Sequence, residues 1–281
     1  MQLAHNPAAE RAAADGGGVG AVIAACCNPG PWRHDTIALT AAISLATTLC
    51  YHAAMQAATA RCTRIANIGA GRTRAWLQSA IVPQAGQFVL ARYWPGLDPY
   101  LSSAVFPAAL TSDGFALELP SDDATLPYLV PGADVRLTGP FGQPMPMRHQ
   151  PDSRILFICA RNPHHLLPLA QQALQAGADI TLLLERPYPL QTLDARIEAR
   201  HGELLTLLRN HLAWAEKVFV DCLPGARMRA TLQPLAGDSY ALFAEALPCG
   251  TGACQGCAVP GAKGYQLACV NGPFFRLSAL A

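Results

Sequence analysis

The 281-residue sequence has few charged residues: Asp, Glu, Lys and Arg make up 14%, and the formal net charge is +1. A chain so close to neutral has no field that attracts a polyanion, and it has no basic stretch with interleaved aromatic residues. No nucleic-acid partner is therefore expected. Hydrophobic residues make up 51%, which excludes a disordered protein, and the length suffices for two domains, each with its own core.

Long hydrophobic runs are also lacking. The uncharged stretch "TIALTAAISLATTLC", residues 36–50, is shorter than the about 20 residues that a helix needs to cross a bilayer. No membrane span is predicted. Residues 1–61 are rich in Ala and Gly and are interpreted as an extension that is either disordered or upstream of the native start.

The sequence does not show the short, cysteine-dense pattern of a secreted disulfide scaffold, although it has ten cysteines. Six of them are scattered in apolar or loop contexts. Cys159 in "ILFICA" and Cys222 in "VFVDC" stand where a small buried residue suffices. The ample apolar sequence favours a reducing compartment, so a cytoplasmic location is expected.

The pattern of apolar segments divides the rest of the chain. Residues 62–150 contain short apolar segments between Gly and Pro, which predict a small antiparallel β-barrel. Residues 151–245 alternate strand-like and helix-like segments, beginning with a continuous apolar run at 154–160, and predict a doubly wound parallel sheet. Within this part, residues 193–215 are predicted to form one or two helices. Residues 246–281 form a separate cysteine-bearing segment.

That segment contains "LPCGTGACQGC", with a further cysteine after eleven intervening residues. Structural thiols do not suit a loop so rich in glycine, and disulfides require an oxidising compartment. Zinc is a third alternative, but the spacing offers only one conventional knuckle. The fourth is a [2Fe–2S] cluster, because C-x4-C-x2-C with a distant fourth cysteine is the plant-type ferredoxin spacing. The candidate metal ligands are Cys249, Cys254, Cys257 and Cys269.

The iron–sulfur interpretation has a physical reason. Three thiolates must converge on one small cluster, and backbone N–H groups must point inward to the sulfur atoms. Glycines between the ligands allow positive φ and a close approach of the backbone. This interpretation is favoured, and zinc stays open as the alternative.

With these residues the chain resembles the electron-transfer subunit of dihydroorotate dehydrogenase, an iron–sulfur flavoprotein of the ferredoxin–NADP reductase superfamily. The similarity runs from about residue 62 to 281 and is most specific in "CGTGACQGC…CVNGPFF". "PQAGQFVLARY" and "PGADVRLTGPFG" also look like segments of the family's barrel. The resemblance implies a ferredoxin reductase-like barrel, an α/β domain, a C-terminal [2Fe–2S] loop with the four cysteines as ligands, and a role in pyrimidine biosynthesis.

The resemblance also implies FAD, but the residues expected to hold it differ. Where the family has an Arg-Pro-x-Ser-type segment, this chain has "YLSSAVFP", so Ser102 and Ser103 replace the cation that would face the pyrophosphate. Thr125 matches a second flavin-contacting position, but Asp122 and Asp123 precede it in place of glycine and lysine. These residues argue against FAD.

The residues expected at the pyridine-nucleotide site differ from the family pattern even more. The turn "ARNPHHLLPL" contains no glycine that would let the backbone approach a phosphate, and the family's Cys-Gly-Pro becomes Cys-Leu-Pro in "DCLPGARM". NAD(P) is therefore not expected. His164 and His165 are predicted to lie in an exposed turn rather than to bind a metal or act in catalysis.

The sequence thus predicts an electron-transfer subunit that passes single electrons through a [2Fe–2S] cluster to or from a partner oxidoreductase, such as a dihydroorotate dehydrogenase catalytic subunit. No general base or nucleophile is evident, so no catalytic residue is predicted. Two alternatives remain: a self-contained FAD-dependent NAD(P)H reductase, and a non-redox scaffold stabilised by zinc.

Overall fold

The structure is a computed structural model that describes residues 56–96, 101–145 and 152–281. The predicted extension therefore lies, up to residue 55, outside the described residues. The first described strand begins at Gln56, so it crosses the boundary suggested at residue 62. Among the described residues, no helix is both long and apolar enough to span a membrane.

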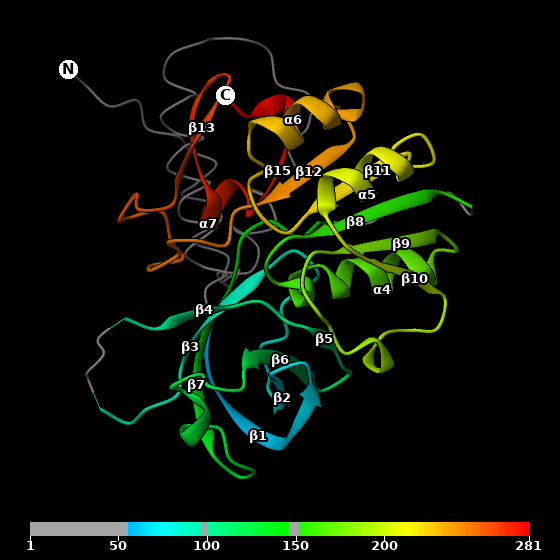
Figure 1. Cartoon of the computed structure of the whole chain (residues 1–281). Coiled ribbons are helices and arrows are strands. Elements are labelled where there is room, and N and C mark those ends of the chain that lie inside the picture. The colour runs from blue at the N-terminus through cyan, green and yellow to red at the C-terminus, as the bar shows by residue number, and fades with distance from the viewer. Residues whose placement is uncertain (1–55, 97–100, 146–151) are drawn as a thin grey trace, which may run out of the picture. The chain divides into compact units, whose positions relative to one another are not determined.

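The first part of the chain forms a curled antiparallel sheet (Figure 1). Its order is β4-β3-β7-β1-β2-β6-β5. Alternating burial along β2 and β7 places one face of each strand against a common core, which is what period-2 patterning requires. The strands are β1 (Gln56–Gly69), β2 (Arg72–Gln78), β3 (Phe88–Arg92), β4 (Ser103–Val105), β5 (Ala109–Leu110), β6 (Gly114–Pro120) and β7 (Asp134–Phe141).

The core of this sheet is apolar and continuous. Leu77, Val89, Phe115 and Leu137 come from four different strands and are almost fully buried together. The sequence prediction of an antiparallel barrel with short strands is thus confirmed, with the sheet curled between the edge strands β4 and β5.

The second sheet has the order β10-β9-β8-β11-β12-β15 and is parallel except for the last strand. Figure 1 shows α4 on one side of the sheet and α5 and α6 on the other, which confirms the doubly wound arrangement. The elements are β8 (Arg154–Cys159), α4 (Leu167–Gln175), β9 (Asp179–Leu184), β10 (Ile197–His201), α5 (Leu204–His211), β11 (Lys217–Val220), α6 (Ala226–Leu232), β12 (Ser239–Leu242) and β15 (Phe274–Arg276).

The apolar run that opens this sheet is central, as predicted. Residues 155–159 of β8 are at most 2% exposed, because helices cover both faces. The prediction for residues 193–215 is wrong in part: Ile197–His201 is the edge strand β10, parallel to β9, and only Leu204–His211 is helical. Sheet pairing overrides the helix-forming Glu, Ala and Arg of this stretch.

The C-terminal segment adds a hairpin of β13 (Ala258–Gly261) and β14 (Gly264–Leu267), followed by α7 (Ala268–Asn271). β15 then returns antiparallel to β12 and closes the edge of the parallel sheet. Short 3₁₀ turns complete the fold: η1 (Leu126–Tyr128), η2 (Pro163–His165), η3 (Leu190–Thr192), η4 (Gln233–Leu235) and η5 (Leu277–Ala279).

Candidate iron–sulfur site and the adjoining pocket

The hairpin β13–β14 explains the spacing between the last two predicted ligands. Its register pairs Ala258 with Leu267, and the Ala268 N–H donates to the Cys257 carbonyl at 3.0 Å. The eleven residues between the cysteines therefore fold back on themselves, and the Cys257 and Cys269 Sγ atoms lie 3.2 Å apart. The hairpin itself was not predicted, although Gly261 and Gly264 mark its turn.

The other two cysteines form a second neighbouring pair. Cys254 lies close enough to Cys249 to contribute to the lowering of the pKa of Cys249. Cys254 is exposed, whereas Cys257 and Cys269 are buried. The structure thus brings Cys257 and Cys269 into contact and places Cys249 beside Cys254, but it does not join the four predicted ligands into one metal-binding group. Among the described residues, no three His, Cys, Asp or Glu side chains are grouped to hold a single metal ion.

Backbone N–H groups point at the sulfur atoms, as a cluster-binding loop requires. The Gly256 N–H donates to Cys254 Sγ at 3.5 Å, and the Gly252 N–H donates to the sulfur of Cys269. Burial opposes ionisation of Cys249, but N–H groups of Cys254 and Thr251 lower its pKa to about 6. The thiolate is the form that binds metal, and these donors fit an iron–sulfur cluster, whose potential depends on hydrogen bonds to sulfur.

Burial, together with the adjacent Cys257, raises the pKa of Cys269 well above its ordinary value. Metal is the partner that would keep such a buried thiol deprotonated, because a coordinated thiol loses its proton outright. The donor set of four thiols, two of them buried, therefore fits a soft metal centre.

The loop is fixed by the end of β7, more than a hundred residues earlier in the sequence. The Gly142 N–H donates to the Cys269 carbonyl at 3.0 Å, and the Gln143 side chain donates to the Val270 carbonyl at 2.8 Å. Gly250 has φ +71°, and a Cβ there would lie 2.7 Å from the Phe141 ring. Glycine beside the first ligand is thus required both by conformation and by space.

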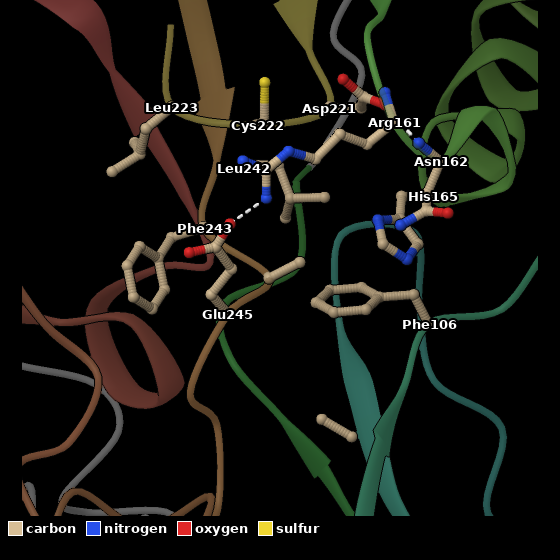
Figure 2. A pocket seen from close by; sticks show the side chains of 12 residues that line it. Phe106, Arg161, Asn162, His165, Asp221, Cys222, Leu223, Leu242, Phe243 and Glu245 are labelled. Carbon is tan, nitrogen blue, oxygen red and sulfur yellow. Dashed lines mark hydrogen bonds and ion pairs between the residues drawn. The ribbon is translucent and has the colours of Figure 1, made fainter. Parts of the chain in front are cut away.

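A pocket of about 400 Å³ lies at the carboxyl ends of β8, β11 and β12. Figure 2 shows Phe106 beside His165 on one side, and Phe243 and Glu245 on the other. The Phe106 and His165 ring centroids are 4.7 Å apart. The carboxyl-edge pocket is lined by Ala104, Phe106, Arg161, Asn162, His165, Asp221, Cys222, Leu223, Leu242, Phe243, Ala244 and Glu245.

The two histidines do lie in a turn, η2, but the predicted exposure is wrong, because His164 is buried and His165 is half-buried. His164 is 7% exposed, and its Nδ1 lies 2.7 Å from Nη2 of Arg72. Nδ1 of His165 is buried without a hydrogen-bond partner. Burial, with Arg72 nearby, lowers the pKa of His165 to about 3, so both rings are neutral at pH 7. Sequence reasoning missed this because burial here depends on packing against the first sheet.

The positions that would hold a flavin pyrophosphate are used otherwise. Ser103 belongs to β4 and pairs with Ala91. Thr125 donates its hydroxyl and its N–H to Asp123, at 2.6 and 2.8 Å, which stabilises the turn η1. Segment 97–107 contains no Arg or Lys. The residues present do not fit a pyrophosphate at this place, since no cation there would neutralise it.

The known structures define the class of this fold. A NADH-dependent reduced ferredoxin–NADP oxidoreductase, described for flavin-based electron bifurcation, has a TM-score of 0.58 at 18% identity, with 79% of this chain and 89% of that chain covered. The Amycolatopsis cytochrome P450 reductase GcoB has a TM-score of 0.52 at 16% identity, with 66% of each chain covered. The fold is therefore that of the ferredoxin reductase-like flavoproteins.

The family comparison identifies the C-terminal segment. Residues 245–281 match the iron-sulfur cluster binding domain of dihydroorotate dehydrogenase B. The predicted resemblance to the electron-transfer subunit of dihydroorotate dehydrogenase is confirmed by this match together with the reductase-like fold. No curated protein matches the sequence significantly.

Proposed function

We propose that this chain is an electron-transfer subunit that passes single electrons through a [2Fe–2S] cluster held by Cys249, Cys254, Cys257 and Cys269. The observation that carries the proposal is the folding of the cysteine loop. A hairpin brings the second pair of thiols together, backbone N–H groups face the sulfur atoms, and the end of β7 fixes the loop. The C-x4-C-x2-C spacing supports the two-iron type.

A bound [2Fe–2S] cluster would supply one-electron transfer: one electron leaves a reduced donor for the cluster and then leaves the cluster for an acceptor. The chain's own residues hold and orient that centre. The exposure of Cys254 supports an exchange of electrons at the surface of the loop, whereas Cys257 and Cys269 are shielded. The partner proposed from the family match is a dihydroorotate dehydrogenase catalytic subunit or a similar oxidoreductase.

The test is the metal content of the full chain purified without oxygen. Two irons and two acid-labile sulfides per chain, with the absorption and EPR spectra of a [2Fe–2S] centre, are expected. Cys257→Ser should lose most of the iron, whereas Cys222→Ser, which changes a free thiol outside the loop, should retain it. Zinc without sulfide would contradict the proposal and favour the scaffold alternative.

The self-contained FAD-dependent reductase stays a second candidate because of the carboxyl-edge pocket. Its aromatic lining and the unpartnered Nδ1 of His165 suit a planar heteroaromatic ring. Against it stands the missing cation for the pyrophosphate. A flavin absorption band that NADH bleaches would support this candidate, and purified protein without flavin would exclude it.

A further inference from the structure

Three successive backbone N–H groups donate to a single carboxylate at the carboxyl end of β8. The N–H of Ala160 donates to Asp221 Oδ1 at 2.8 Å, and the N–H groups of Arg161 and Asn162 donate to Oδ2 at 2.7 and 2.6 Å. Figure 2 shows Asp221 beside these two residues. The turn 160–162 is thus an anion-binding concavity whose occupant belongs to the same chain.

This position has a defined use in α/β folds that bind nucleotides. The turn after the first parallel strand, followed by a helix N-terminus, presents its N–H groups to a phosphate. In this chain the three N–H groups of the turn already donate to Asp221. Pro163 supplies no N–H, and the 3₁₀ turn η2 separates the sheet from the start of α4 at Leu167. An incoming phosphate would find none of the three N–H groups of the turn unpaired.

The carboxylate is held firmly. Asp221 is 3% exposed and follows β11, which pairs directly with β8. Its own N–H donates to the Ile158 carbonyl at 3.0 Å. Register between neighbouring strands therefore aims the side chain at the turn, and moving it away would leave three N–H groups without partners.

The charges around the turn also disfavour the binding of a phosphate there. Arg161, which is the one Arg or Lys side chain among the described residues that line the carboxyl-edge pocket, forms an ion pair with Glu245. Within that pocket two carboxylates thus stand against one guanidinium. A pyrophosphate would meet like charges at short range, and its binding would be disfavoured.

We propose that Asp221 occupies the phosphate-binding turn as a built-in anion and excludes the pyrophosphate of NADH and NADPH from it. The inference rests on the electron-transfer role proposed above and makes the electron donor more specific. The cluster is then reduced by a protein partner, which gives up one electron for each cluster reduced, and not by NADH or NADPH. In this view the departure of this turn from the nucleotide-binding pattern is a specificity device.

The test compares two carboxylates of the same pocket in the full, cluster-loaded chain. Calorimetric titration with inorganic pyrophosphate should show binding to Asp221→Ala that is about tenfold or more tighter than to Glu245→Gln or to the unchanged chain, because only Asp221→Ala frees the N–H groups. Equal affinities in the two variants would overturn the inference.

A second measurement needs no variant and covers the case in which Asp221→Ala does not fold. Hydrogen–deuterium exchange of amides 160–162 in the unchanged chain should be the same with and without NADH or NADPH. Slower exchange on adding either nucleotide would overturn the inference. Iron and sulfide contents, measured on the same sample, test the cluster separately, so the electron-transfer proposal stands or fails independently.

Discussion

The Tyr188 hydroxyl donates one hydrogen bond, shared between the two carboxylate oxygens of Glu118, at 2.8 and 3.0 Å. Glu118 lies on β6 of the curled sheet, and Tyr188 follows β9 of the parallel sheet. The same carboxylate pairs with Arg72 at 3.2 Å and with Arg74 at 2.5 Å, and its side chain is completely buried. One buried anion therefore joins two sheets and compensates two cations.

Replacing Glu118 by Gln should strongly destabilise the protein. The substitution keeps the shape but leaves two largely buried guanidinium groups without a counter-ion, which costs about 3–5 kcal/mol in comparable buried pairs. Glu216→Gln is the control, because Glu216 pairs with Arg154 at the surface, where such a pair is worth about 0–1 kcal/mol. Urea unfolding measures both. Equal unfolding free energies for the two variants would contradict the assigned role of Glu118.

Stability should fall as the pH falls below about 6.5, where an unfolded histidine takes up a proton. Burial lowers the pKa of His164 well below its ordinary value, with further contributions from His165, Arg72 and Arg74. The folded state therefore resists protonation in this range while the unfolded state does not, so the unfolding free energy decreases toward acid pH.

The slope for His164 alone should approach about 1.4 kcal/mol per pH unit. Urea unfolding between about pH 7.5 and about pH 5 measures it. His164→Gln should lower the slope by the contribution of His164 and leave that of His165, because Gln still accepts from Arg72 but does not titrate. His201→Gln, at an exposed histidine, should leave the slope unchanged; a flat profile in the unchanged chain would refute the assignment.

Gly250→Ala should lower the iron content of the purified protein. The backbone at Gly250 has φ +71°, which alanine rarely adopts, and the added Cβ would lie 2.7 Å from the Phe141 ring. The backbone beside Cys249 must therefore shift. Gly71→Ala is a matched control, since Gly71 has φ +67° but no atom within 4 Å of the added Cβ. Iron per chain is measured for both; an equal content would show that the contact with Phe141 does not hold the loop.

Phe219→Ala should destabilise the second sheet. The Phe219 ring stacks on Phe157 and Tyr240, with centroids 5.3 Å away in each case, and is 1% exposed. Truncating a buried Phe costs about 3–5 kcal/mol, whereas Tyr265→Ala, at a side chain that is 79% exposed, should change stability by less than about 0.5 kcal/mol. Thermal and urea unfolding of both variants check this.

The elements best predicted from the sequence are those whose pattern is set locally. The apolar run of β8 and the alternation in β7 depend on the faces that each strand buries, which the sequence displays directly. β10 and β15 are short, and their strand structure depends on partners elsewhere in the chain. Local propensity carries little information about such pairings.

The residues of the candidate site also differ in whether the sequence alone could identify them. The four cysteines could be chosen from spacing and glycines, because a cluster-binding loop is nearly contiguous in sequence. Asp221 could not, since its acceptor role depends on β11 lying beside β8, and the N–H groups that it binds are about 60 residues away. The burial of His164 likewise depends on Arg72, which belongs to the other sheet.

The attachment of the cysteine loop to the end of β7 also bears on how the protein matures. Gly142 and Cys269 are 127 residues apart in sequence, and contacts of such long separation form late because closing a long chain segment costs entropy. We therefore expect iron and sulfide to be inserted after the curled sheet has formed. A chain whose first sheet is damaged would then be made without its metal, even with every cysteine intact.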